Sequence, residues 1–158
     1  MENEHEHRVV AWWASGKTGI AKADSTPNAI HFTAPPEFGG LEGRWTPEDL
    51  LLTALASCFT TTFHAIAGYS KFEYTDLAVQ AQGTVRKTDS GYCFSAIALH
   101  PTLTIPQEEH RERAVTLLQK SHALCLVSRA LAEEPGFEYS VEIGKKSHAP
   151  KPRALQVR

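Results

Sequence analysis

One segment constrains the fold of this chain more than any other, the apolar run that begins at "TPEDLLLTALASCF". Thr46 suits a helix N-cap and Pro47 the first helical position, and two acidic residues then suit the positive end of the helix dipole. We expect this helix to run from Pro47 to about Ala67 and to stop at Gly68. Its apolar residues occupy most of the circumference, which is typical of a helix that is buried on nearly all sides.

Length and charge narrow the class of protein. A chain of 158 residues suits one domain or one protomer of a dimer. Its formal net charge of -2 provides no electrostatic field for nucleic acid or an anionic membrane, so neither is an expected partner. No apolar run approaches the roughly 18 residues of a spanning helix, and the polar start "MENEHEHRVV" is not a signal peptide. We therefore expect a cytoplasmic protein.

The remaining segments alternate between strand and helix patterns. Strand patterns occur at 8–15, 19–25, 28–34, 72–87, 92–105 and 137–143. We expect a bulge near Gly83 in the strand over 72–87. A second helix is expected at 107–134. This order predicts an α+β fold with antiparallel sheets around two long helices, in a single domain over 1–144 with a basic tail over 145–158.

The chain has three cysteines, Cys58, Cys93 and Cys125, and no CxxC motif. Their number and spacing do not fit a secreted disulfide framework. Cys58 and Cys125 lie on the two expected helices, so a packed helix pair can bring them together. A second thiol can resolve an oxidised cysteine, but cysteines are also common core residues, and composition alone leaves both interpretations open. We expect Cys93, on a strand, to be structural.

The segments "TPEDLLLTALASCF" and "HALCLVSRAL" resemble the OsmC/Ohr family of thiol-dependent hydroperoxide reductases, named for osmotically inducible protein C and the organic hydroperoxide resistance protein. "SGKTGIAKAD" and "TAPPEFGG" are similar to the family's first hairpin and to the loop before its first helix. The likeness covers about residues 9–143. It implies an OsmC-like fold and an intertwined homodimer with sites at the subunit interface.

The resemblance also implies an activity. Cys58 would attack an organic hydroperoxide and become a sulfenic acid, and Cys125 would resolve it as a disulfide. A dithiol reductant, possibly of lipoyl type, would reduce the pair again, and no metal or other cofactor is implied. Glu48 would hold the cation that stabilises the thiolate.

Two positions depart from the family pattern. The family's arginine in the first hairpin aligns with Lys17, which keeps the charge but lacks the planar fork that grips a carboxylate. Arg44, close to the helix start, is the alternative cation. Leu126 stands where the family often has proline, and this affects the expected helix geometry after Cys125.

Helix geometry adds a constraint of its own. Glu48 and Cys58 are ten residues apart, or about 15 Å along a helix, so they cannot meet within one straight helix. If both serve one site, either the helix breaks or Glu48 comes from a second chain. The apolar circumference of this helix favours the second chain.

Aromatic and histidine residues complete the candidate site. Phe38 and Trp45 flank the loop before the helix and are expected to form a lid, and Phe59 is expected to line a pocket for a hydrophobic substrate. His122 precedes Cys125 by three residues, so it either tunes that thiol or simply packs. An alternative function is an OsmC-like dimer that binds a small hydrophobic ligand with little peroxidase turnover.

Overall fold

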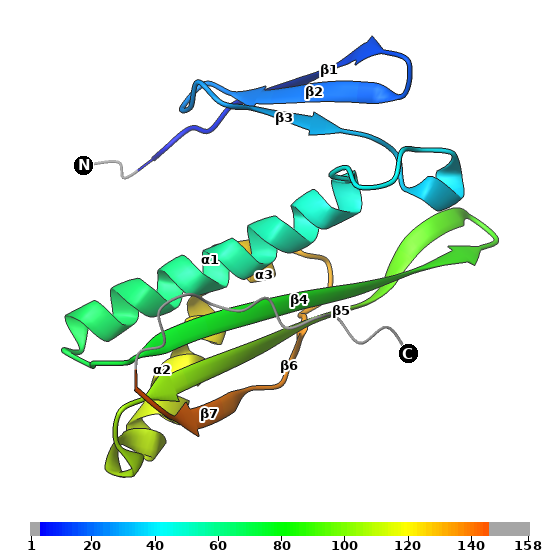
Figure 1. Ribbon diagram of the computed structural model, residues 1–158. Coiled ribbons are helices and arrows are strands. Elements are labelled where there is room, and N and C mark those ends of the chain that lie inside the picture. The colour runs from blue at the N-terminus through cyan, green and yellow to red at the C-terminus, as the bar shows by residue number, and fades with distance from the viewer. Residues whose placement is uncertain (1–3, 146–158) are drawn as a thin grey trace. The chain divides into compact units, whose positions relative to one another are not determined.

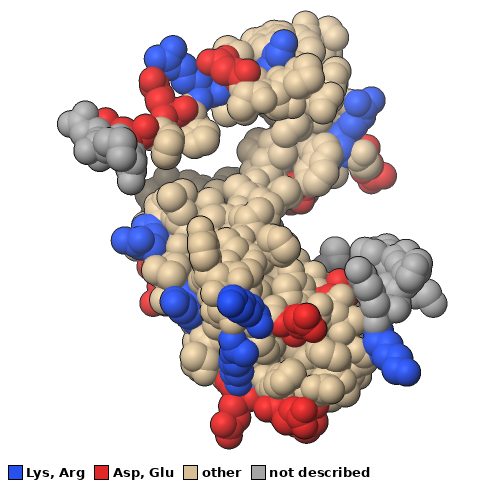
Figure 2. Space-filling model, turned by 90° about the vertical axis from the view of Figure 1, so that its left-hand side faces the viewer, with Lys and Arg blue, Asp and Glu red and all other residues tan. Residues whose placement is uncertain are grey.

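The computed structural model describes residues 4–145, so all of the predicted basic tail except Lys145 lies outside the described residues. The chain divides into two compact units, residues 1–51 and 52–158, and the boundary falls within the first long helix. Each unit has a sheet of its own (Figure 1). Both units carry mixed charge, and Figure 2 shows basic and acidic side chains next to one another rather than in large fields of one sign.

The first unit holds a three-stranded antiparallel sheet in the order β1 (Val9–Ser15), β2 (Thr18–Ala23) and β3 (Ala29–Phe32). These strands confirm the three predicted N-terminal strands. A short 3-10 helix, η1 (Pro36–Phe38), follows in the predicted loop. Every residue of β1 is exposed, and the hydrophobic core cluster of the described chain lies entirely in the second unit. The sheet therefore has no hydrophobic core of its own.

The long helix α1 (Pro47–Tyr69) begins where the sequence predicts. Thr46 is the residue before it, and its hydroxyl oxygen accepts a hydrogen bond from the Asp49 N–H (3.2 Å). The Thr46 N–H in turn donates to the Asp49 carboxylate (3.1 Å). This reciprocal pair is a capping box, which satisfies N–H groups that the first turn of a helix leaves without partners.

The second unit builds a sheet on the long hairpin of β4 (Asp76–Thr88) and β5 (Gly91–Ile105). The predicted irregularity occurs between Thr84 and Val85, but the extra residue is Ser95 on the opposite strand. The Ser95 hydroxyl donates to the Thr84 carbonyl (3.2 Å). Gly83 leaves room for the Phe94 ring, which would lie 2.6 Å from an added Cβ.

The end of the chain departs from the predicted antiparallel pairing. The single strand expected at 137–143 is two short strands, β6 (Gly136–Phe137) and β7 (Ser140–Ile143). Both pair parallel to β5. The return through α2 explains this direction, because a connection that crosses over the sheet on a helix brings the next strand back parallel.

The core of the second unit lies between α1, β5 and the second helical segment. That segment contains η2 (Glu108–His110), α2 (Arg111–Leu124) and α3 (Leu126–Ala130). Alternate residues of β5 face inward, and one side of α1 and of α2 packs on them. The core residues from α1, β5 and α2 are Leu55, Phe59, Phe63, Ile66, Ala67, Leu99, Leu103, Ile105, Ala114, Leu117 and Leu118.

The remaining side of α1 is exposed within this single chain. It carries Ala54, Ser57, Thr61 and Ala65. By length and composition alone α1 could cross a membrane, contrary to the expectation that no segment reaches that length, and a core helix passes the same test. The structure thus buries one side of α1 and leaves a surface of small residues uncovered.

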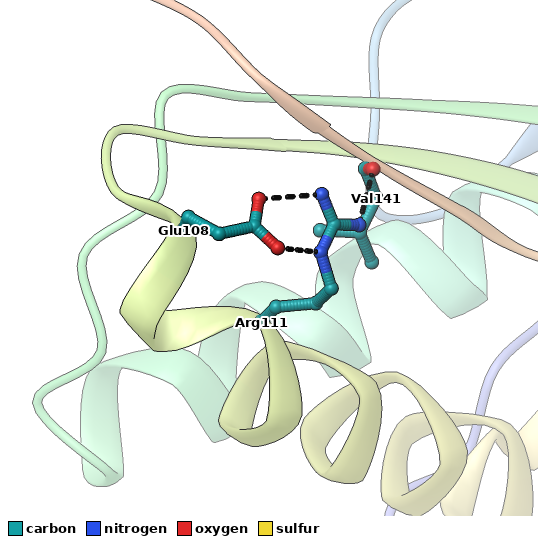
Figure 3. Close-up of polar contacts among 3 residues, drawn as sticks. All are labelled: Glu108, Arg111 and Val141. Carbon is teal, nitrogen blue, oxygen red and sulfur yellow. Dashed lines mark hydrogen bonds and ion pairs between the residues drawn. The ribbon is translucent and has the colours of Figure 1, made fainter.

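An arginine joins the start of α2 to the last strand. Two nitrogens of Arg111 donate to the Glu108 carboxylate, one of them at 2.8 Å, and a third donates to the Val141 carbonyl at 2.7 Å (Figure 3). The hydrogen bond from Arg111 holds the pKa of Glu108 below its ordinary value. Arg111 therefore fixes β7 against the beginning of α2, although Glu108 and Arg111 are both near the surface.

The end of α1 differs from the prediction that Gly68 stops the helix. The helix continues to Tyr69, and the left-handed position after it belongs to Lys71, at φ 49°. The Phe72 N–H donates to the Ala67 carbonyl (2.8 Å) and the Lys71 N–H to the Gly68 carbonyl (3.1 Å). This is a Schellman motif, in which a hydrophobic contact between the residues corresponding to Phe72 and Ala67 commonly accompanies the hydrogen bonds. The position at which the helix ends is thus set by the burial of Phe72 in the core and not by Gly68.

The left-handed backbone at Lys71 gives the first prediction. Replacing Lys71 with glycine should make the protein about 1 kcal/mol more stable than the Lys71→Ala variant, because only glycine adopts this conformation without a Cβ clash. Urea unfolding of the two variants measures the difference. Equal stability would show that residue 71 does not keep its left-handed conformation in solution.

Candidate functional site

Glu48 lies in the first turn of α1, within the first unit. Its side chain is half-buried, and the carboxylate oxygen Oε2 is fully buried with no hydrogen-bond partner among residues 4–145. A buried carboxylate oxygen without a donor is costly, since the group has left water without compensation. The site is therefore suited to a cation or another strong donor that reaches Glu48.

The two candidate cations also lie in the first unit, and both are exposed. Lys17 occupies the β1–β2 turn, where its carbonyl accepts a hydrogen bond from the buried Thr33 hydroxyl (2.7 Å). Arg44 stands in the loop just before α1. In the described part of the chain neither side chain forms an ion pair or a hydrogen bond. The structure thus leaves both cations available but pairs neither with Glu48.

The predicted aromatic residues divide into two groups. Phe38, in η1, and Trp45, before α1, are partly exposed, at 42% and 50%. Phe59 is completely buried in the core of the second unit, so it does not line an open pocket within this chain. The lid and substrate-binding roles of the three residues stay predictions.

Cys58 lies on α1 within the second unit, where it is half-buried and packs against the hydrophobic core. Its partial exposure places Cys58 at the edge of the core rather than inside it. A half-buried thiol is accessible from solvent, which a reactive cysteine requires together with a nearby positive charge.

Cys125 is completely buried and is itself a member of the same core cluster. It separates α2 from α3, so the predicted continuous helix over 107–134 is wrong at this point. Its φ of -62° is helical, whereas its ψ of 112° is extended. The Cys125 N–H still donates to the His122 carbonyl (3.3 Å), which makes it the last hydrogen bond of α2. The chain therefore turns away from the helix immediately after the thiol-bearing Cα.

A short chain of aromatic rings joins the elements that carry the two thiols. His122, in the last turn of α2, stacks on Phe137 of β6 with ring centroids 4.2 Å apart and planes at 5°. Phe137 also packs on Phe59 of α1, with centroids 5.7 Å apart. Since Phe59 follows Cys58 and His122 precedes Cys125 by three residues, these contacts hold both thiol neighbourhoods against β6.

Other groups singled out in the sequence lie apart from this cluster. Cys93 is exposed on β5, opposite Arg86 of β4. His64 forms a hydrogen bond with the Tyr74 hydroxyl (3.0 Å). Burial raises the pKa of Tyr74, with a smaller contribution from Asp76. Among residues 4–145 no group of three or more His, Cys, Asp or Glu side chains is placed to hold a metal ion.

Sequence reasoning identified the two helix cysteines but missed the break between α2 and α3 and the ring that stacks on His122. Leu126 gives no signal for a helix break, because leucine is a strong helix former. Phe137 was expected on the last strand, but its contact with His122 depends on the parallel pairing of β6.

Comparison with known proteins gives a consistent result. A family model described as OsmC-like protein matches residues 40–140. Peroxiredoxin OsmC of Escherichia coli is 26% identical over 80% of this chain and 87% of its own length. The uncharacterized protein YmaD of Bacillus subtilis is 25% identical over 89% of this chain and 97% of its own length. An organic hydroperoxide resistance protein from Elizabethkingia anophelis has the same fold, with a TM-score of 0.72, 20% identity, and coverage of 91% of this chain and 100% of that chain.

The match to the family model covers more than half of the chain, so the protein belongs to the OsmC-like family. The structural likeness confirms the predicted α+β fold of this family. At the level of the family, relatives carry names that denote peroxiredoxins and hydroperoxide resistance.

The backbone at Cys125 gives a prediction about Leu126. Replacing Leu126 with proline should stabilise the protein by about 0.4–1 kcal/mol. Proline suits the first position of α3, where the N–H has no intrahelical partner, and it favours the extended ψ already present at Cys125. Urea unfolding measures the change. Leu124→Pro is the matched control and should cost about 3 kcal/mol, because residue 124 is still inside α2.

Proposed function

We propose that this protein is a thiol-dependent hydroperoxide reductase that uses Cys58 and Cys125. The observation that carries the proposal is the arrangement of the two cysteines in an OsmC-like fold. Cys58 is half-exposed at the edge of the core that contains Cys125, and one aromatic cluster holds both neighbourhoods. The names of the Escherichia coli and Elizabethkingia relatives point to the same class of reaction.

The proposed reaction has two oxidative steps, followed by reduction of the disulfide. The Cys58 thiolate attacks the distal oxygen of an organic hydroperoxide, so that the alcohol leaves and Cys58 becomes a sulfenic acid. Cys125 then attacks the Cys58 sulfur and releases water as the disulfide forms. A dithiol, possibly of lipoyl type, exchanges with this disulfide and restores both thiols. The half-exposed position of Cys58 fits the cysteine that meets the substrate, and the buried position of Cys125 fits the one that resolves it.

Glu48 and a cation complete the proposed site. The buried oxygen of Glu48 has no donor among the described residues, which supports a charged partner for it. Lys17 and Arg44 are both exposed and unpaired in the described chain, so either can supply that charge. Two arguments favour different residues as this cation. The guanidinium of Arg44 can form two parallel hydrogen bonds to the Glu48 carboxylate, whereas Lys17 aligns with the arginine in the family's first hairpin.

The proposed site needs two copies of the chain. The helix α1 has no break between Glu48 and Cys58, so about 15 Å of axial rise separates them within one chain. The uncovered side of α1 and the exposed strand β1, whose Trp12 and Trp13 are 45% and 60% exposed, are surfaces that a second copy would bury. In the proposed homodimer each Cys58 receives Glu48 from the partner.

The cysteine assignment is tested by stopped-flow oxidation of the reduced protein with tert-butyl hydroperoxide. We expect fast oxidation that is lost in Cys58→Ser, and a persistent sulfenic acid in Cys125→Ser, because that variant lacks the resolving thiol. The Cys93→Ser variant is the matched control and should behave as the unmodified protein does. Oxidation no faster than that of an ordinary thiol would contradict the proposal and favour a ligand-binding role.

The shared site is tested by mixing two inactive variants. Glu48→Gln and Cys58→Ser homodimers should each have little activity, whereas mixed dimers formed by refolding them together should recover about one intact site in each dimer. Light scattering checks that the active species is a dimer. An active monomer, or no recovery in dimers shown to be mixed, would rule out donation of Glu48 by the partner.

A further inference from the structure

The unusual feature next to Cys125 is a buried histidine nitrogen without a partner. The His122 side chain is 13% exposed, and its Nδ1 atom is fully buried with no hydrogen-bond partner among the described residues. The Ser128 hydroxyl, three residues after Cys125, is also buried without a partner. Two unsatisfied buried polar groups, three residues before and three residues after a buried thiol in the sequence, require an explanation, since such groups normally find partners.

The contacts of His122 determine which nitrogen carries the proton. Nε2 lies 3.0 Å from a carboxylate oxygen of Glu134. A carboxylate only accepts hydrogen bonds, so Nε2 is the donor in this contact, and in the neutral ring Nδ1 therefore has the lone pair. The stack on Phe137 keeps the ring in this orientation. The buried nitrogen is thus an acceptor that has no hydrogen-bond donor among the described residues.

Cys125 follows His122 by one turn of the backbone. Cys125 has a helical φ, and its N–H donates a hydrogen bond to the His122 carbonyl. The side chains of His122 and Cys125 therefore leave α2 on the same side, one turn apart. Side chains in this relation have Cβ atoms about 5–6 Å apart, a separation that one water molecule can bridge. Ser128, three residues after Cys125, has a buried hydroxyl without a partner among the described residues, which such a water can also contact.

We propose that His122 accepts the proton of Cys125 when the disulfide forms. The inference rests on the proposed function and specifies its second step. The Cys125 sulfur forms a bond to the Cys58 sulfur, the S–O bond of the Cys58 sulfenic acid breaks, and the S–H proton moves to Nδ1, directly or through one water. His122 then returns this proton to the departing hydroxide, which leaves as water. The ring ends neutral, and the sulfenic acid is the only oxidant consumed.

The role of Glu134 follows from this assignment. It acts through His122 and is therefore a positioning residue: its carboxylate fixes the tautomer that leaves Nδ1 unprotonated, and it stabilises the ring while the ring briefly carries a second proton. Glu134 is 79% exposed, so it holds this charge in contact with water while the histidine ring reaches inward.

The experiment measures the two oxidative steps separately. Reduced protein is mixed with one equivalent of tert-butyl hydroperoxide. Sulfenic acid at Cys58 is followed by trapping with dimedone, and closure of the disulfide is followed by alkylation of the remaining thiols and mass spectrometry. His122→Phe keeps a ring to stack on Phe137 but removes both nitrogens, and His122→Gln keeps a donor near Glu134 but removes Nδ1. We expect both variants to form the sulfenic acid at the unmodified rate and to close the disulfide about 100-fold more slowly.

Chemical rescue separates proton transfer from a structural effect. In His122→Ala, added imidazole should restore closure in proportion to its concentration, because it supplies the missing base next to Phe137. His100→Phe is the matched control, since His100 is also partly exposed and paired with a glutamate, Glu138, at 3.7 Å, but it lies on β5. This control should close at the unmodified rate.

The outcomes are distinguishable. Normal closure in His122→Phe and His122→Gln, or slow closure that imidazole does not restore, would overturn the role of His122 and leave the proposed function intact. If the unmodified protein forms no sulfenic acid at Cys58, the proposed function fails, and the inference fails with it.

Discussion

The apolar side chains of α1 must leave water, and this requirement organises the second unit. Leu55, Phe59 and Phe63 are completely or almost completely buried, and side chains of this size contribute about 1.5–3 kcal/mol each when they are removed from water. The inward-facing residues of β5 and the apolar side of α2 supply the surface that covers them. Cys58 and Cys125 owe their common environment to this packing, because each belongs to an element that the core brings together.

Within one chain, only one side of α1 is removed from water. The second side of α1 remains exposed, and the three-stranded sheet of the first unit has no buried apolar residues among those described. Monomeric proteins rarely leave so many tryptophan and valine side chains of one strand in water. The proposed homodimer accounts for these surfaces, and in it the partner supplies the Glu48 that the continuous helix keeps about 15 Å from Cys58 in its own chain.

Local sequence signals predicted much of the fold, and they failed where long-range packing competed with them. Thr46 and Pro47 placed the start of α1 correctly, since a capping box acts within a single turn. Gly68 did not end the helix, because burial of Phe72 shifted the left-handed position to Lys71. The break at Cys125 and the stack of His122 on Phe137 depend on a parallel strand pairing that no nearby residue indicates. The cysteines of the candidate site were therefore predictable, whereas their surroundings were not.

The parallel pairing of β6 also bears on when the thiol environment forms during folding. The β4–β5 hairpin needs only a tight turn, but β6 reaches β5 after the whole segment from η2 to α3 has crossed the sheet. Contacts between residues far apart in the sequence form slowly, because a large loop must close first. Phe137, whose ring packs on Phe59 and His122, belongs to β6, so we expect its contacts to form late in folding. A partly folded chain therefore has both thiols but not yet the environment that joins them, so the redox chemistry of the pair depends on completion of the fold.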